Sequence, residues 1–205
     1  RLRSRGVPEL RVAPEELAAL SHAPSNEPQG VGLVMRQTWE PWASQSAEHA
    51  ACWLALEEVR SPGNLGTLLR TSEATGSTGL LALGSKIDPF EPGCVRATMG
   101  ALFTRRFARA APAELALWAK AHHVLVVGAT GDATVDYRDI SYSRPVVLVL
   151  GAERKGLSPA ARSACDITVR IPMVGRTDSL NLAVAGSVLL YEVYSQRHPR
   201  ASARK

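Results

Sequence analysis

The chain has 205 residues and a mass of 22.0 kDa, which suits one ordinary domain with a short additional segment. A hydrophobic content of 45% with 21% charged residues is typical of a globular protein. The longest apolar run, residues 145–150, is far shorter than the roughly 18 residues of a membrane span, so we expect no membrane-spanning segment.

The net charge of +5 and the pI near 9.4 permit nucleic-acid binding without demonstrating it. Basic residues concentrate in three places, within residues 1–5, 105–109 and 197–205. For any one cluster, a solvated surface explains the charge as well as contact with RNA does. The three clusters together favour a polyanionic partner.

The three cysteines, Cys52, Cys94 and Cys165, lie far apart and have no second Cys or His at metal-ligand spacing. We therefore expect small buried thiols, no disulfide framework and no bound metal, and a reducing cytoplasm as the location. The chain begins with Arg1 instead of Met, which indicates a trimmed chain, and no targeting segment is visible at this start.

Residues 1–36 are predicted to be a fragment of a separate small unit. A short helix opens at Pro14, with acidic residues near its positive end, and residues 30–35 resemble a strand. Residues 37–50 have no clear hydrophobic period and are predicted to be a linker.

Strands and helices alternate from residue 51 to the end of the chain. Strands are expected over 52–59, 79–83, 124–128, 146–150 and 167–171, and helices over 64–75, 92–103, 112–122, 159–164 and 179–196. This alternation predicts an α/β fold, with a mostly parallel sheet and helices on both faces. The last helix is apolar nearly all round, which indicates burial, and we expect a homodimer interface there.

Three connections between these elements carry residues suited to a functional site. In the first, over 61–71, Asn64 can cap the following helix, or the turn can expose N–H groups while Arg70 presents a charge to a phosphate. In the second, over 148–158, a buried strand runs into Gly151 and Glu153 at the edge where ligands of such sheets bind. A plain turn with solvated charges explains this second connection equally well.

The third connection covers residues 171–186. A strand ends at Ile171, a polar loop with a glycine follows, and Ser179 is the expected helix cap. Asn181, just inside the expected helix, is a poor helix former, which favours a role for its side chain. The Gly-x-Gly-x-x-Gly fingerprint is missing from the chain, and this disfavours a nicotinamide-dependent dehydrogenase.

In this order and at these intervals, the three connections resemble the three sequence motifs of the SpoU family of RNA methyltransferases. The matches are Asn64-x-Gly66-x-x-x-Arg70-Thr71, then Gly151-x-Glu153-x-x-Gly156, then Ile171-Pro172-Met173-x-Gly175 followed by Ser179-Leu180-Asn181. Each motif is weak alone, but three in register are specific. Residues 1–36 resemble the end of the RNA substrate-binding domain, a small α/β domain, that many members carry ahead of residues equivalent to 51–205.

The resemblance implies a deep trefoil knot at the C-terminal end, a rare exception to ordinary chain threading. It implies a homodimer that transfers methyl groups from S-adenosylmethionine to ribose 2′-hydroxyls of RNA, with rRNA preferred over tRNA by analogy. The cofactor-binding positions carried over are Thr130, Gly151, Ile171 and Leu180. The catalytic positions carried over are Arg70, Asn64, Glu153, Ser179 and Asn181. Because a guanidinium keeps its proton, we expect Arg70 to clamp a phosphate and stabilise the emerging alkoxide.

Two alternatives share the same fold. A base methyltransferase would need a base that faces a ring nitrogen, and Asp178 is the candidate. A non-catalytic RNA-binding factor would have lost turnover, against which the complete set of motif residues argues. One departure from the family pattern is Leu182-Ala183, where many relatives carry a serine; we expect activity despite it.

Overall fold

The computed structural model describes residues 6–21, 30–45, 47 and 52–199, and it divides the chain into two compact units, Arg1–Gln37 and Thr38–Lys205. In the first unit, helix α1 (Pro14–Ser21) begins at the expected proline. The strand predicted over 30–35 is wrong, because no described residue of this unit offers a neighbouring strand with which it could pair. None of the described helices is long and apolar enough to cross a membrane.

The second unit is built on an eight-stranded sheet in the order β1-β4-β3-β2-β7-β5-β8-β6, and all neighbouring strands pair in parallel. The strands are β1 (Glu40–Pro41), β2 (Cys52–Leu56), β3 (Gly79–Ala82), β4 (Arg106–Arg109), β5 (Leu125–Ala129), β6 (Val135–Asp136), β7 (Val146–Leu150) and β8 (Ile167–Arg170). The predicted α/β fold with a parallel sheet is confirmed.

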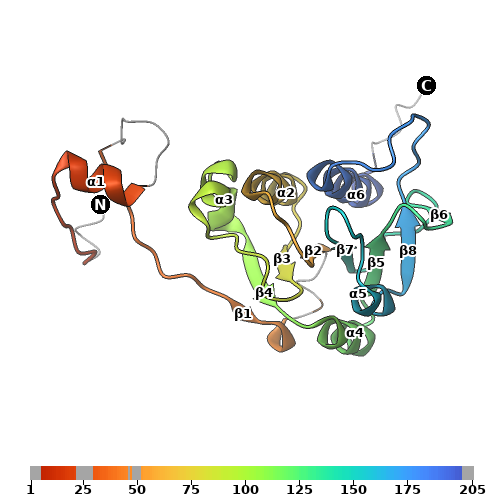
Figure 1. Ribbon diagram of the computed structural model, residues 1–205. Coiled ribbons are helices and arrows are strands. Elements are labelled where there is room, and N and C mark those ends of the chain that lie inside the picture. The colour runs from red at the N-terminus through yellow and green to blue at the C-terminus, as the bar shows by residue number, and fades with distance from the viewer. Residues whose placement is uncertain (1–5, 22–29, 46, 48–51, 200–205) are drawn as a thin grey trace, which may run out of the picture. The chain divides into compact units, whose positions relative to one another are not determined.

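Helices cover both faces of this sheet (Figure 1). One face carries α2 (Pro62–Ala74), α3 (Pro92–Ala97) and α6 (Leu182–Arg197), and the other carries α4 (Pro112–Ala121) and α5 (Pro159–Ser163). Side chains alternate along β2 to fill a core on each side: Leu54 and Leu56 pack toward α2 and α6, and Trp53 packs toward α4. Strands buried on both faces explain the continuous apolar runs in the sequence.

The sequence pattern missed three strands and merged two elements. Strands β1 and β6 have two residues each, and β4 is bounded by arginines, so none shows an apolar run. The helix predicted over 92–103 is broken, since Met99 and Gly100 have φ angles of 50° and 94°, outside the helical region. A short 3₁₀ turn (Ala101–Thr104) follows the break.

The three arginines at 105–109 have partners within the fold, so this cluster is not simply a solvated surface. Arg106 forms an ion pair with Glu40 on β1, and the Arg105 guanidinium donates to the Ser77 carbonyl. The Arg109 guanidinium lies 3.8 Å from the centroid of the Trp39 ring. Residues 1–5 and 200–205 of the other two basic clusters lie outside the described residues, and Arg197 of the third cluster donates to the carbonyl groups of Tyr142 and Arg144.

Part of the segment predicted to be a linker belongs to the second unit. Trp42 is buried against Trp53 and Trp118, with ring centroids 5.2 and 4.4 Å away. The Trp118 indole N–H donates to the Gln45 carbonyl at 3.1 Å. Aromatic packing and the Arg106–Glu40 ion pair thereby fix residues 38–45 to the sheet.

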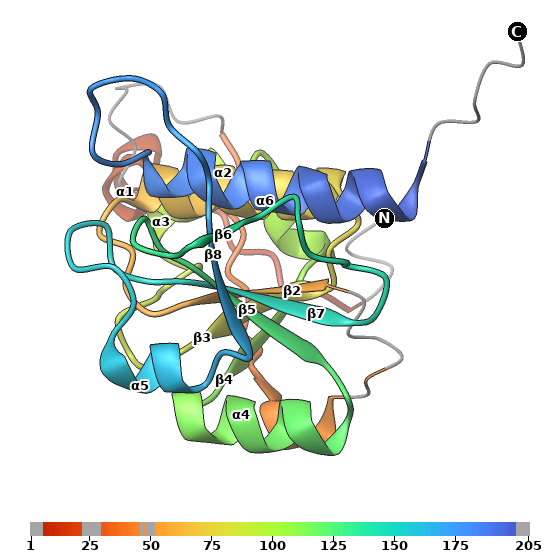
Figure 2. The ribbon, with the colours of Figure 1, turned by 90° about the vertical axis from the view of Figure 1, so that its right-hand side faces the viewer.

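Helix α6 runs alongside α2 above the sheet (Figure 2). The two helices approach closely because Gly186 has no side chain: a Cβ there would overlap Leu68 of α2. The burial predicted for α6 holds on this face only. Away from Gly186, Val184 and Tyr191 of α6 are 50% and 52% exposed.

Candidate functional site

A cavity of about 720 Å³ opens where β5, β7 and β8 end. Its walls come from residues 129–131 at the end of β5, from residues around the end of β7 (150–156), from residues between β8 and the start of α6 (169–182), and from Asn64 of α2 and Ala185 of α6. The carboxyl ends of parallel strands are where open α/β sheets bind ligands. Eight of the nine residues predicted for the site line this cavity: Asn64, Thr130, Gly151, Glu153, Ile171, Ser179, Leu180 and Asn181.

Three of these side chains form a continuous hydrogen-bonded chain. Asn64 donates from Nδ2 to Oε1 of Glu153 at 2.5 Å, and Asn181 donates from Nδ2 to Oδ1 of Asn64 at 3.2 Å. The three residues come from α2, from the loop after β7 and from the start of α6. The fold therefore unites all three motifs in one polar cluster at the cavity wall.

The helix caps differ from those expected, and the side chain of Asn64 is therefore not used as a cap. Ser61 is the N-cap of α2 and accepts a hydrogen bond from the Asn64 backbone N–H at 3.3 Å. Pro62 then occupies the first helical position, which favours this earlier start. Because Asn64 does not cap the helix, its amide can reach Glu153.

At α6 the cap is Asn181 instead of Ser179. Its Oδ1 accepts from the backbone N–H groups of Ala183 and Val184 at 2.8 and 3.4 Å. The side-chain oxygen of Asn181 thus caps the helix, while its Nδ2 donates to Asn64. Ser179 lines the cavity from the exposed loop before the helix.

The loop after β7 is tight because its ends pair with each other. Ala152 and Gly156 exchange two backbone hydrogen bonds of 2.9 Å. A Cβ at Gly151 would overlap the Gly156 backbone, and Gly156 itself has a φ of +65°. Both motif glycines are therefore required by the backbone geometry that presents this loop to the cavity.

A polar contact that sequence reasoning missed holds Thr130. Its hydroxyl donates to Asp132 Oδ1 at 2.5 Å, and Arg162 of α5 donates to Asp132 Oδ2 at 2.8 Å. The hydrogen bond from the Arg162 side chain lowers the pKa of Asp132, so this carboxylate stays ionised. Residues 132 and 162 match no motif, and no sequence pattern brings them together.

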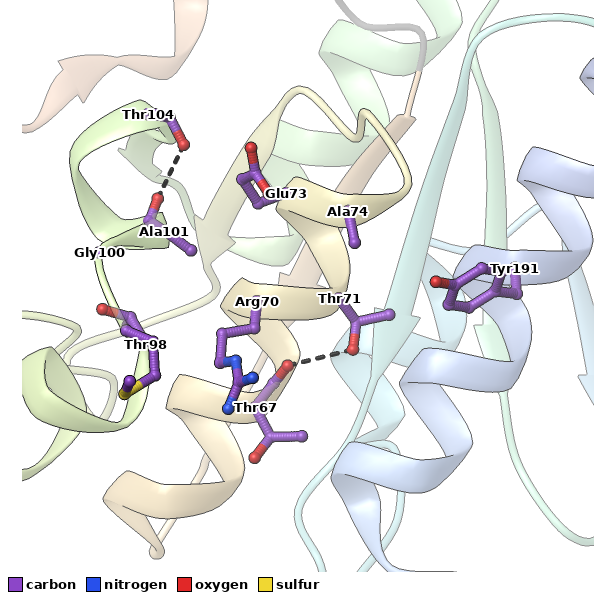
Figure 3. A pocket seen from close by; sticks show the side chains of 11 residues that line it. Thr67, Arg70, Thr71, Glu73, Ala74, Thr98, Gly100, Ala101, Thr104 and Tyr191 are labelled. Carbon is purple, nitrogen blue, oxygen red and sulfur yellow. Dashed lines mark hydrogen bonds between the residues drawn. The ribbon is translucent and has the colours of Figure 1, made fainter.

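Arg70, the ninth predicted residue, lies in a different cavity. This second cavity has a volume of about 810 Å³ and lies among α2, the turn at 98–104 and Tyr191 of α6 (Figure 3). The Arg70 side chain projects from α2 on the side that faces Thr98. It forms no hydrogen bond or ion pair with any residue that the structure describes, and it is exposed.

In a comparison with known protein families, residues 51–191 match the SpoU rRNA Methylase family. The chain belongs to the SpoU family. It is 38% identical over 143 residues to a 23S rRNA (uridine(2479)-2′-O)-methyltransferase of Streptomyces viridochromogenes, a match that covers 67% of this chain and 50% of that protein. A putative TrmH family tRNA/rRNA methyltransferase of Staphylococcus haemolyticus is 35% identical, over 70% of this chain and 58% of that protein.

Solved methyltransferase structures share the fold. An AdoMet-bound rRNA methyltransferase from Sinorhizobium meliloti is 40% identical with a TM-score of 0.74, over 80% of this chain and 63% of that one. The SpoU methyltransferase AviRb from Streptomyces viridochromogenes, in complex with AdoMet, is 35% identical with a TM-score of 0.67, over 72% and 58%. The chain thus spans about half to two thirds of the length of these relatives.

Proposed function

We propose that this chain is the catalytic part of an RNA methyltransferase that transfers a methyl group from S-adenosylmethionine to a ribose 2′-hydroxyl. The observation that carries the proposal is the hydrogen-bonded set Glu153–Asn64–Asn181, assembled from three distant motifs beside one cavity. Membership of the SpoU family supports the reaction type. Ribosomal RNA is the preferred substrate, because the Streptomyces relative is named for 23S rRNA, whereas other relatives are named for tRNA or rRNA.

The first cavity suits S-adenosylmethionine in size and lining. Its volume lies within the roughly 300–1,000 Å³ typical of cofactor pockets. Apolar side chains such as Leu150 and Ile171 offer contact to an adenine ring, and the carboxylates of Glu153 and Asp178 favour a cation. We assign Thr130, Gly151, Ile171 and Leu180 to hold the cofactor, which supplies an activated methyl group on a sulfonium.

The polar cluster would orient the acceptor ribose. Asn64 occupies Oε1 of Glu153, and no described residue bonds Oε2, so this oxygen is available to accept a hydrogen bond from a ribose hydroxyl. Ser179 and Asn181 line the same wall and would position the nucleotide. Tight orientation matters because a ribose hydroxyl is a weak nucleophile.

We assign Arg70 to the RNA backbone. Asn64 and Arg70 are six residues apart on α2, which is about 9 Å along the helix axis. An RNA strand with its acceptor ribose near Asn64 would thus bring a neighbouring phosphate toward Arg70, whose guanidinium has no partner among the described residues. A guanidinium keeps its proton, so its role would be to clamp the phosphate and stabilise developing negative charge.

A homodimer is the proposed assembly. Three side chains of α6, Val184, Tyr191 and Tyr194, are 50%, 52% and 39% exposed. Apolar and aromatic side chains gathered on one helix face are typical of an interface. Light scattering should give twice the 22.0 kDa chain mass, and Tyr191→Glu should shift the protein toward the monomer.

Further parts of the proposal concern the architecture. We infer that residues 1–36 end an RNA substrate-binding domain, that 37–50 lead from it with 38–45 already packed on the sheet of the second unit, and that 51–205 form the methyltransferase domain with a deep trefoil knot. The strand order supports the knot. Strand β8 lies on the far side of β5 from β7, and α6, which follows β8 in the chain, nevertheless packs on α2 and β7. A cytoplasmic location and the lack of a resident metal stay predictions; the described residues include no group of three potential metal ligands.

The deciding experiment is methylation with radiolabelled S-adenosylmethionine of rRNA and tRNA side by side, followed by nucleoside analysis. We expect label in 2′-O-methylnucleosides of rRNA. Label on a base would favour a base methyltransferase, and binding of RNA without any transfer would favour a non-catalytic factor. Label in tRNA alone would overturn the substrate preference and leave the reaction type intact.

A further inference from the structure

Glu57 follows β2 directly and touches both ends of the loop that follows β7. Its backbone N–H donates to the Leu150 carbonyl at 3.2 Å. Its carboxylate accepts two hydrogen bonds from Ser158, one from the backbone N–H at 2.8 Å and one from the hydroxyl at 2.5 Å. Leu150 and Ser158 bracket residues 151–157, so one residue holds this loop where it leaves the sheet and where it enters α5.

The loop between these two anchors has little freedom of its own. Ala152 and Gly156 are paired by two hydrogen bonds, and the contact of Gly151 with Gly156 leaves no space for a Cβ. These contacts couple the two ends of the loop. A displacement at Ser158 would therefore carry Gly151 and Glu153 with it.

The chemistry of Glu57 matches this task. An ionised carboxylate only accepts hydrogen bonds, and its two oxygens receive the two donors of a single serine. The Ser158 hydroxyl also accepts from the Ala161 N–H at 3.1 Å as the N-cap of α5. The carboxylate thereby fixes the direction of the hydroxyl proton as well as the backbone.

We propose that Glu57 is a positioning residue for S-adenosylmethionine, which holds the 151–157 loop in the place where it forms the wall of the cofactor cavity. Glu57 does not itself line that cavity, whereas Gly151, Ala152 and Glu153 do. The inference rests on the proposed cofactor site. It predicts that loss of the carboxylate weakens cofactor binding without removing any group that touches the cofactor.

The neighbouring Glu58 provides a matched control. Its carboxylate accepts from Arg60 and Lys86, each at 3.1 Å, and does not contact the loop. Glu57 and Glu58 are therefore adjacent residues of the same type that differ in the groups their carboxylates contact. A general effect of charge at the end of β2 would appear in both variants.

The test is calorimetric titration of the full 205-residue chain with S-adenosylhomocysteine. Glu57→Ala should bind about tenfold more weakly than the unmodified chain, because two hydrogen bonds to a charged acceptor are lost. Glu57→Gln should bind only about threefold more weakly, since its oxygen still accepts from one Ser158 donor. Glu58→Ala should bind as the unmodified chain does. If Glu57→Ala does not fold, the comparison of Glu57→Gln with Glu58→Gln decides.

Methylation kinetics separate positioning from a general structural role. In Glu57→Gln the KM for S-adenosylmethionine should rise while kcat at saturating cofactor stays within about twofold, because bound cofactor restores the loop. Unchanged affinity in both Glu57 variants, or a fall in kcat with an unchanged KM, would overturn the inference. If the unmodified chain does not bind S-adenosylhomocysteine, the proposed cofactor site fails, and the inference fails with it.

Discussion

Asn64 and Glu153 are joined by a hydrogen bond of 2.5 Å although 89 residues separate them in the sequence. Asn64 is the third residue of α2, and Glu153 lies in the loop after β7. The pairing of β2 with β7 in the centre of the sheet brings these two connections together. Asn181, at the start of α6, donates a hydrogen bond to Asn64 and so joins the same cluster.

Asn64→Ala should reduce methyl transfer by about tenfold or more, because Glu153 and Asn181 both lose the group that aligns them. The three side chains lie at the cavity wall and not in the core, so the melting temperature should fall by no more than about 4 °C. Single-turnover rates and thermal unfolding measure the two effects. A large loss of stability with normal turnover of the folded fraction would contradict this role.

Asn181 has two functions that substitutions can separate. Asn181→Asp keeps an oxygen that accepts from the Ala183 and Val184 N–H groups but cannot donate to Asn64. We expect the free energy of unfolding to stay within about 0.5 kcal/mol, with activity lowered at least about tenfold. Asn181→Ala should also lose about 1 kcal/mol of stability. Ser179→Ala is the control, and an equal destabilisation there would show that Ser179 is the cap.

Gly151→Ala should disrupt the cofactor cavity. The added Cβ would overlap the backbone of Gly156, which cannot shift without breaking its pairing with Ala152. We expect a loss of about 1–3 kcal/mol in unfolding free energy and at least about tenfold weaker binding of S-adenosylhomocysteine. Gly131→Ala is matched, because Gly131 lines the same cavity and a Cβ there meets nothing within 4 Å. Equal effects in both variants would disprove the steric explanation.

Arg70→Ala should leave cofactor binding within about twofold, because Arg70 lines the second cavity and not the first. Turnover should fall by about 100-fold or more, as expected when a charged group that stabilises a developing negative charge is removed. Arg70→Lys should recover only part of the rate, since lysine keeps the charge without the bidentate geometry. Arg96→Ala, an exposed arginine on α3 outside both cavities, is the control. Loss of cofactor binding in Arg70→Ala would move Arg70 into the cofactor site.

The parallel sheet could be predicted from sequence because its central strands are continuous apolar runs, such as Val146–Leu150, between regular helices. Strand β4 could not, because Arg106 and Arg109 bound only two buried residues. The broken helix after Ala97 depends on a positive φ at Met99, which residue type does not reveal. Short edge elements depend on their partners more than on their own pattern.

For the candidate site, the sequence pointed to nine residues, eight of which line one cavity, but it did not reveal how they divide between two cavities. Motif spacing pointed to Asn64 and Arg70 together, and the helix then places them six residues apart in different cavities. The caps were assigned to Asn64 and Ser179 because both types favour caps, whereas Ser61 and Asn181 hold those positions. Glu57 and Asp132 could not be found at all, since their partners Ser158 and Arg162 are 101 and 30 residues away.

The ion pair of Arg106 with Glu40 should make the stability of the second unit depend on pH. The hydrogen bond from Arg106 lowers the pKa of Glu40 below its ordinary value of 4.5. A lowered folded-state pKa means that the pair stabilises the fold above pH 4.5 and that this contribution disappears as the pH falls through the folded value. Because both side chains are about one third exposed, the contribution should be only about 1 kcal/mol.

Glu40→Gln removes this contribution at every pH. The difference in unfolding free energy between the unmodified chain and Glu40→Gln should therefore be largest near neutral pH and should vanish well below pH 4.5. Denaturant titrations at pH 7 and at about pH 3 measure it. Glu73→Gln, an exposed glutamate of α2, should give no comparable difference. A difference that persisted at low pH would show that Glu40 stabilises residues 38–45 through packing and not through its charge.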